Sequence, residues 1–225
     1  MKRSEINRCI AQAISFFDTH QFVLPPFSNW SEAEWRKKGR EADEIRSQHL
    51  GWDVTDFNSG QFDSLGLTLF TLRNGSPSGN NSKCYAEKIM YVRQDQVTPW
   101  HYHARKAEDI INRGGGGAGR LVVKLCGSTS EGGFSTDRIT VTCDGVAREL
   151  DPESTVVLGP GESITLPPFL YHTFHAEGGD ALIGEVSSFN DDDRDNFFHD
   201  PLPRYPEIVE DEPRFRLLCN EYRML

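Results

Sequence analysis

The sequence predicts a mainly β protein, built as a sandwich or barrel of antiparallel strands. From about residue 52, short runs rich in β-branched and aromatic residues alternate with Gly, Pro, Asn and Asp, which is typical of strands joined by turns. No helix-length periodic segment separates these runs, so parallel strand–helix–strand units are not expected. The strand-forming runs are LTLFTL, KIMYV, RLVVKL, RITVTC, STVVL, SITL and ALIGEV.

Residues 1–50 are expected to form a helical extension packed on the β domain. Ser4 is a candidate N-cap of a first helix that ends near Thr19. Its apolar residues recur at helical spacing, at Ile6, Ile10, Ala13, Ile14 and Phe17. The stretch from Ser31 to Glu34 has the form of a capping box and predicts a short second helix through Lys38. We interpret both helices as packing elements.

Residues 51–225 are expected to hold the β domain and a C-terminal wrap, so that the chain is one structural domain overall. From Asn190 onward the sequence is rich in Pro and charge, which predicts an extended segment that wraps the outside or covers a mouth. The acidic run from Asp191 to Asp193 lacks the spacing of a calcium loop. We interpret it as a solvated charge cluster.

The composition favours a small-molecule partner. The 34 acidic and 24 basic residues give a formal charge of -10, which disfavours nucleic acid and anionic membranes as partners. No apolar run is long enough to span a bilayer, and the start of the chain lacks the apolar core of a signal peptide. The five cysteines are scattered and form no CxxC pair, so we expect a cytoplasmic protein without a disulfide framework.

The first candidate site lies in the stretch from His101 to Glu108. His101 and His103 are two residues apart, and such residues share one face of a strand. We expect a short turn near Ala104 and Arg105 to return the chain antiparallel and bring Glu108 alongside. Two neutral imidazoles and a carboxylate would then converge on a divalent first-row metal and leave coordination positions open. An isolated His-x-His pair is, however, more often a pair of surface histidines.

A second stretch supplies a fourth candidate ligand. Between Gly161 and His172 a glycine turn, a strand, a proline turn and a histidine follow one another. The two stretches together favour a metal site formed by His101, His103, Glu108 and His172 over surface histidines.

These two stretches resemble the two motifs of the cupin superfamily. The first is His-x-His, four residues, Glu, six residues and Gly115, and the second is Gly161, five residues, Pro167 and His172. The resemblance implies a cupin jelly-roll β-barrel that holds the metal inside, here with N-terminal helices and an extended C-terminal segment. The sequence departs from the motifs at Asp95 and Phe169, where cupins usually have Gly, and at Ala176, where Asn is usual. These are turn or supporting positions, so the departures question local geometry more than metal ligation.

The stretch AEKIMYVRQDQVTPWHYHARKAEDIINRGGG is more closely similar to the metal-site block of the D-lyxose ketol-isomerase family, and the chain length and the NEY near the C-terminus also fit. This resemblance implies one divalent metal ion per chain, with manganese as the family's metal. It also implies the interconversion of D-lyxose with D-xylulose and of D-mannose with D-fructose, in cytoplasmic homodimers.

Isomerisation of an aldose moves one proton between C1 and C2 and another between the neighbouring oxygens, so a metal-stabilised cis-enediol would need acid–base groups nearby. Lys106 is two residues from Glu108 and is expected to share its inward face. Glu185 interrupts the apolar run ALIGEV, where a buried carboxylate needs a partner. Lys88 lies similarly within KIMYV and is the candidate substrate-binding residue. Each of the three could instead point outward, because strand phase shifts with a single residue.

Two other classes of function stay open at this stage: a cupin dioxygenase that uses iron(II) and oxygen, and a non-catalytic sugar-binding cupin. A dioxygenase would consume oxygen, an isomerase would turn over anaerobically, and a binding module would hold sugar without converting it.

Overall fold

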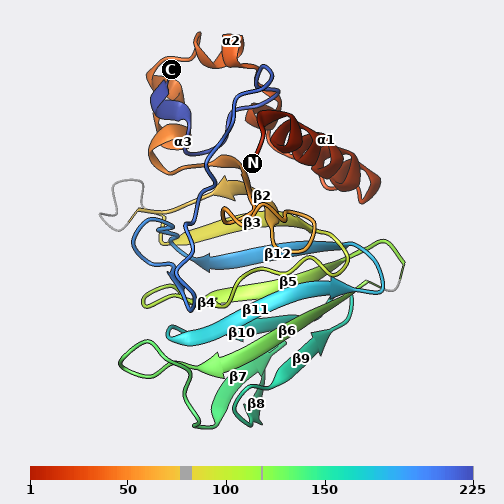
Figure 1. Ribbon diagram of the computed structural model, residues 1–225, viewed down its shortest axis with the longest axis vertical. Coiled ribbons are helices and arrows are strands. Elements are labelled where there is room, and N and C mark those ends of the chain that lie inside the picture. Colours follow the sequence, from red (N-terminus) through yellow and green to blue (C-terminus); the bar gives the residue numbers. More distant parts are fainter. Residues whose placement is uncertain (77–82, 118, 225) are drawn as a thin grey trace.

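The computed structural model describes residues 1–76, 83–117 and 119–224. Within these residues, thirteen strands form an eight-stranded and a five-stranded sheet, in which all paired strands are antiparallel. Figure 1 shows the two sheets below a cap of helices. The prediction of a mainly β fold with antiparallel strands is therefore confirmed.

The larger sheet runs in the order β1-β2-β3-β12-β5-β10-β7-β8. Its strands are β1 (Gly51–Thr55), β2 (Leu67–Arg73), β3 (Tyr85–Val92), β12 (Ala181–Ser188), β5 (Glu108–Gly115), β10 (Ser163–Leu166), β7 (Ile139–Cys143) and β8 (Val146–Leu150). The smaller sheet runs in the order β13-β4-β11-β6-β9. Its strands are β13 (Phe197–Phe198), β4 (His101–Tyr102), β11 (Leu170–Glu177), β6 (Arg120–Gly127) and β9 (Thr155–Leu158).

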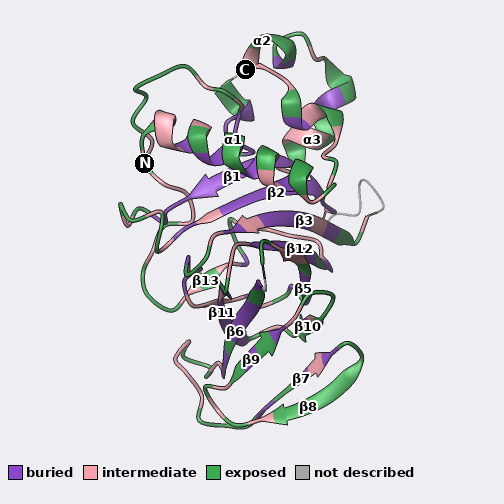
Figure 2. Ribbon diagram, turned by 90° about the vertical axis from the view of Figure 1, so that its right-hand side faces the viewer, coloured by how far each residue is buried: buried purple, intermediate pink, exposed green. Residues whose placement is uncertain are grey.

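The apolar runs seen in the sequence reflect two separate cores. Between the sheets, side chains from both, such as Met90, Ile110 and Val123, form one core. On the other face of the larger sheet, helix α1 (Arg3–Thr19) packs against β1, β2, β3 and β12 in a second core that contains Trp52 and Phe70 (Figure 2). Because β2, β3 and β12 contribute side chains to both cores, they do not show a strict alternation of apolar and polar residues.

The remaining short helices lie in the cap. They are η1 (Pro26–Asn29), α2 (Glu32–Trp35), η2 (Arg40–Ala42) and α3 (Asp43–Ser47) before β1, and η3 (Tyr222–Met224) near the C-terminus. Among the described residues, no helix combines the length and apolar character needed to cross a membrane.

Of the two predicted helix starts, the one at Ser31 is confirmed and the one at Ser4 is wrong. Helix α1 begins at Arg3, and Ser4 lies inside it, where its backbone N–H and hydroxyl donate to Asp211. The prediction of Ser4 as the N-cap is therefore wrong, because Lys2 occupies the N-cap position and the carboxylates of Glu5 and Asp211 accept the backbone N–H groups of Lys2 and Ser4. Ser31 does cap α2, with Glu34 completing the capping box. The helix itself ends at Trp35, before the expected Lys38.

The C-terminal segment ties the helical cap to the sheets. In Figure 1 it runs in blue from the end of β12 past the strand ends and up to the helices. Its later part fastens to α1 through Arg3, which has no exposed surface and pairs with Glu221 and Glu210. Its first part contributes Asp192, Asn196, Phe198 and Arg204 to the wall of the cavity described below.

Two departures from the cupin motifs keep the backbone conformation that glycine would favour. Asp95 has φ 61° and Phe169 has φ 63°, both in the left-handed region. Non-glycine residues adopt this region at a cost of about 1–2 kcal/mol, and Asp tolerates it better than most. Phe169 also donates its backbone N–H to the carbonyl of His103 over 2.8 Å. The turn geometry is therefore retained without the glycines.

Replacing Arg3 should destabilise the fold strongly. Arg3→Ala would leave the buried carboxylate of Glu221 without its closest partner, so we expect the free energy of unfolding to fall by about 3 kcal/mol. Arg8→Ala, at an exposed position of the same helix, should change it by less than about 0.5 kcal/mol. Denaturant titration of both variants measures the difference, and equal midpoints would contradict the role of Arg3 as a clamp.

Candidate metal centre

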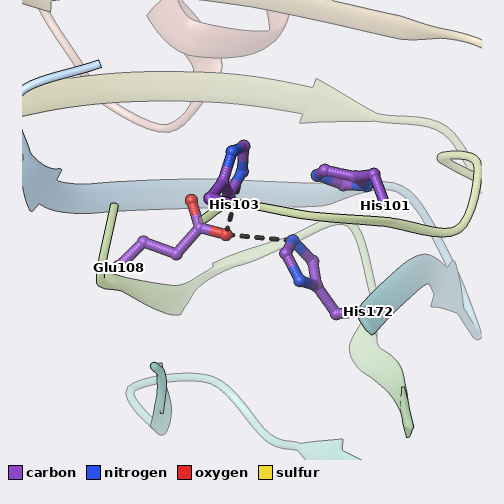
Figure 3. Close-up of side chains that lie close together, drawn as sticks. All are labelled: His101, His103, Glu108 and His172. Atoms are coloured by element: carbon purple, nitrogen blue, oxygen red, sulfur yellow. Dashed lines mark ion pairs between the residues drawn. The ribbon is translucent and has the colours of Figure 1, made fainter. Parts of the chain in front are cut away.

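Four side chains converge at one end of the space between the sheets. Each of His101, His103, Glu108 and His172 offers a ligand atom, and these atoms all lie within 4.8 Å of one another. Figure 3 shows the three imidazoles and the carboxylate directed toward a common point. The structure thus brings together all four residues that the sequence singled out as metal ligands.

The route by which the chain joins these residues differs from the prediction. His101 lies in β4, which pairs with β11 at His172 in the smaller sheet. Glu108 opens β5, which pairs with β10 and β12 in the larger sheet. The stretch after His103 therefore crosses from one sheet to the other, and the expected turn near Ala104 and Arg105 that returns the chain antiparallel to the His101–His103 segment is wrong. The ligands meet because the two sheets face each other.

Hydrogen bonds fix the tautomer of each imidazole. The Nδ1 atom of His101 lies 2.8 Å from the carbonyl of Pro99, and that of His172 lies 3.1 Å from the carbonyl of Leu170. Nδ1 of His103 contacts the carbonyl of Asp195. Because a carbonyl only accepts, each Nδ1 must carry the proton, which leaves each Nε2 with a free lone pair. This is the arrangement that metal-binding histidines usually adopt.

The contact between His172 and Glu108 fits a cation bound between the two side chains. Oε1 of Glu108 is buried and lies 2.9 Å from Nε2 of His172, yet it accepts no hydrogen bond. With the tautomer assigned above, both atoms carry lone pairs, and two acceptors this close repel each other unless a cation lies between them. The donor set of three nitrogens and one carboxylate suits a divalent first-row metal, so the residues present fit such an ion.

The charge states of the ligands also favour a cation. Burial lowers the pKa of His101 well below its usual value, and burial together with Lys106 lowers the pKa of His103 to about 4. Burial alone would raise the pKa of Glu108, but the nearby Lys106 lowers it well below the usual value. His101 and His103 are therefore neutral and the carboxylate of Glu108 is charged at neutral pH, as metal ligation requires.

Sequence reasoning missed Asp195, which organises the crossing between the sheets. Its carboxylate accepts hydrogen bonds from the backbone N–H groups of Ala104, Arg105 and Lys106, at 2.9–3.0 Å for the shorter contact in each case. Its carbonyl accepts the Nδ1 proton of His103. One buried residue thus holds a metal ligand and the loop that leads to Lys106. The acidic, Pro-rich composition of its segment gave no signal for this role.

The three acid–base candidates form a buried ion-pair network beside the metal site. Nζ of Lys106 lies 2.5 Å from Oε2 of Glu108 and 3.0 Å from Oε1 of Glu185. Glu185 in β12 faces Lys88 in β3 across the sheet, and their charged atoms are 3.4 Å apart. All four side chains are buried. The structure therefore places Lys106, Glu185 and Lys88 inward, next to the ligand cluster.

These contacts shift the pKa values of the network in opposite directions. Burial disfavours the charged form of each group, but the carboxylates of Glu108 and Glu185 raise the pKa of Lys106 above its usual value. In turn, Lys106 and Lys88 lower the pKa of Glu185. At neutral pH Lys106 is consequently an ammonium and Glu185 a carboxylate.

The C-terminal segment contributes further charged groups that the sequence did not reveal. Lys88 donates to Oδ1 of Asn190 over 2.8 Å, and the Asn190 amide donates to Asp192 over 2.8 Å. Asp192 also lies 3.4 Å from Nε of Arg204, which pairs with Asp53 as well. The interpretation of residues 191–193 as a solvated cluster is therefore wrong for Asp192, because Arg204 and Lys88 compensate its charge inside the protein.

The network and the ligand cluster line a common cavity. The cavity has a volume of about 50 Å³, counted as the space that the centres of water molecules can occupy, which is enough for several waters. One part of its wall is charged and another is apolar, with Phe57, Met90, Phe174 and Phe198 among the lining residues. His175 lies outside it, because it lies an odd number of positions after His172 in β11 and therefore faces the other side of the strand.

Comparisons with known proteins identify the family to which the chain belongs. The D-lyxose isomerase family profile matches residues 1–222. A D-lyxose/D-mannose isomerase of Escherichia coli O157:H7 is 53% identical, with 99% of each chain covered. One of Serratia proteamaculans is 49% identical, over 99% of this chain and 98% of that protein. The solved L-ribose isomerase of Cellulomonas parahominis, in complex with L-ribose, shares the fold, with a TM-score of 0.59 at 14% identity over 93% of this chain and 98% of that one.

Removal of one imidazole should release the metal. His172→Ala deletes a ligand and disturbs the geometry of the others, so we expect affinity for Mn²⁺ to fall by more than about 100-fold, the upper range seen when only a supporting partner is lost. His175→Ala, in the same strand β11, should bind metal normally. Metal content after dialysis and calorimetric titration of both variants measure the difference. Full metal content in His172→Ala would remove this residue from the site.

Proposed function

Because this chain belongs to the D-lyxose isomerase family, we propose that it interconverts D-lyxose with D-xylulose and D-mannose with D-fructose. Family membership makes it a sugar isomerase, an intramolecular oxidoreductase. The main observation behind this proposal is the composition of the cavity. In it, the candidate metal ligands lie next to the ion pair of Lys106 and Glu185. A metal site alone would suit the dioxygenase and sugar-binding alternatives equally well.

The charge balance of the cavity favours free sugars over sugar phosphates. Among the described residues that line it, the cations are Lys88, Lys106 and Arg204, and the carboxylates are Glu108, Glu185 and Asp192. Each of these cations lies within 4.0 Å of a carboxylate oxygen. A phosphate group would have to displace these carboxylates, whereas a neutral hydroxyl can bind beside them.

We assign the metal site to one divalent ion per chain, with Mn²⁺ as its occupant. His101, His103, Glu108 and His172 would hold the ion, and thiolates, which would favour other metals, are absent from this set. When bound, the ion would act as a Lewis acid that stabilises the negative charge of the cis-enediol form of the sugar.

Glu185 and Lys106 are proposed to move the protons. The carboxylate of Glu185 is ionised and can accept the proton from C2 of the aldose and return it to C1. The ammonium of Lys106, 3.0 Å away, keeps Glu185 ionised. It can donate a proton to O1 of the sugar and take back the proton that O2 releases, so that it ends the cycle in its starting state. Lys88 is proposed to bind substrate, since it lines the cavity and holds Glu185 from the other side.

Isomerase activity is tested directly with the metal-loaded protein. We expect anaerobic conversion of D-lyxose into D-xylulose and of D-mannose into D-fructose, with exchange of the C2 proton for deuterium when solvent reaches the intermediate. Oxygen consumption without ketose formation would favour the dioxygenase, and binding of sugar without conversion would favour the non-catalytic alternative.

Glu185→Gln should separate chemistry from metal binding. It removes the proposed base while keeping the shape of the side chain, so turnover should fall by about 100- to 10,000-fold with metal content unchanged. Lys106→Ala should also lose turnover, and because it removes a cation 2.5 Å from Glu108 it should not weaken metal binding. Glu87→Gln, in the adjacent strand β3, is the control and should stay near the parent rate. Near-parental rates in both site variants would overturn the acid–base assignment.

We further propose a cytoplasmic homodimer. Location in a reducing compartment is supported by the five cysteines, all of which are unpaired. The apolar face of α1 is covered by the larger sheet and is not the proposed contact surface. Support comes instead from Phe169 and Phe197, which are 55% and 41% exposed and flank Tyr102.

The dimer is tested by sedimentation velocity at micromolar concentration. We expect the mass of two chains, and Phe197→Ser should shift the equilibrium toward monomer because it removes exposed apolar area. Val146→Ser, at an exposed apolar position of β8, is a matched control that should leave the mass unchanged. A monomer at this concentration would contradict the proposal.

A further inference from the structure

We propose that Asn196 and Arg204 bind the hydroxyl groups at the end of the sugar remote from C1 and C2, and so determine which sugars the enzyme accepts. The inference rests on the proposed function and extends it to the specificity of the same cavity. Both residues belong to the C-terminal segment and both line the cavity together with the candidate metal ligands.

Each of the two side chains carries a buried polar atom that lacks a hydrogen-bond partner. These atoms are Oδ1 of Asn196, an acceptor, and Nη1 of Arg204, a donor. Burying such a group without a partner costs about 1–3 kcal/mol, and proteins rarely leave one unsatisfied. Here two of them line the same cavity. A sugar hydroxyl donates and accepts at once, so hydroxyls can satisfy both atoms.

The other nitrogens of Arg204 are already engaged, which restricts what Nη1 can bind. Nη2 pairs with Asp53, and Nε lies 3.4 Å from Asp192. These two carboxylates neutralise the guanidinium and hold its plane in place, so that Nη1 is a positioned donor without a surplus of positive charge. This suits a neutral hydroxyl better than a phosphate or a carboxylate.

The surrounding wall fits the carbon side of a sugar. Phe57 and Phe198 line the cavity, with ring centroids 5.6 Å apart. Aromatic rings can pack against the C–H groups of a sugar, while Asn196 and Arg204 bind its hydroxyls. Asn196 directly follows Asp195, which holds His103, so the backbone links the proposed hydroxyl subsite to the metal ligands.

The test compares hydroxyl deletion in the sugar with side-chain deletion in the protein. Asn196→Ala should raise KM for D-lyxose on the order of tenfold with little change in kcat, because it removes binding far from the reacting carbons. With 4-deoxy- and 5-deoxy-D-lyxose as substrates, the effect of Asn196→Ala should vanish for the sugar that lacks the partner hydroxyl.

Arg204→Lys keeps the charge that Asp53 and Asp192 require but lacks Nη1. It should also raise KM for D-lyxose on the order of tenfold with little change in kcat. Asn220→Ala, at an exposed asparagine, is the matched control.

A second measurement does not depend on turnover. The sugar alcohol obtained by reducing D-lyxose keeps the distal hydroxyls and cannot isomerise. Its calorimetric Kd should rise on the order of tenfold in Asn196→Ala and Arg204→Lys at unchanged metal content, and should stay constant in Asn220→Ala.

The outcomes separate this inference from the proposed function. If the parent protein converts no sugar, the isomerase assignment fails, and the binding measurement still tests the subsite. If the parent isomerises D-lyxose but Asn196→Ala and Arg204→Lys match it in KM and in Kd, the subsite is wrong. An equal loss of kcat/KM for D-lyxose and for both deoxy sugars would also overturn it, because that loss would reflect disturbed structure rather than a missing hydrogen bond.

Discussion

The ammonium group of Lys106 lies between two buried carboxylates, Glu108 and Glu185, and the remainder of the site depends on that contact. One carboxylate belongs to the ligand cluster and the other is the proposed base, so a single cation sets the charge state of both. Burying three such groups is tolerated only if each finds a partner. This requirement explains why Lys88, Asp192 and Arg204 continue the network outward, with opposite charges alternating from residue to residue.

The same constraint gives the C-terminal segment its place. Asp192 and Asn190 approach Lys88, and Asp195 accepts hydrogen bonds from the loop that carries Lys106. Without these groups the lysines would lack partners on the side that faces away from the sheets. The segment therefore forms part of the cavity wall and at the same time compensates the charges of the cavity.

The two-sheet architecture decides how the metal ligands meet. His101 and His172 are paired across β4 and β11 in one sheet, and Glu108 comes from the other. The crossing between them is short, since only residues 104–107 separate His103 from β5. Backbone hydrogen bonds to Asp195 fix this crossing, and carbonyl groups fix the three imidazole rings. The ligand geometry is thus imposed by the backbone before any ion binds.

The sequence by itself determined the β-rich fold and the four candidate ligands, and it favoured an inward direction for Glu185 and Lys106 while leaving the outward alternative open for these two and for Lys88. These features are local, because strand periodicity places residues two apart on one face and a charge within an apolar run needs a buried partner. Only the tertiary structure decided which sheet each ligand comes from and that Ser4 binds Asp211 instead of capping its helix. It also decided that Asp192, Asn196 and Arg204 line the cavity and that Asp195 holds His103. Their contacts lie about 90 or more residues away in several cases, such as Lys106 with Asp195 and Arg204 with Asp53. No local pattern encodes such a pairing, because it forms only when the extended segment folds back over charges that the sheets have already buried.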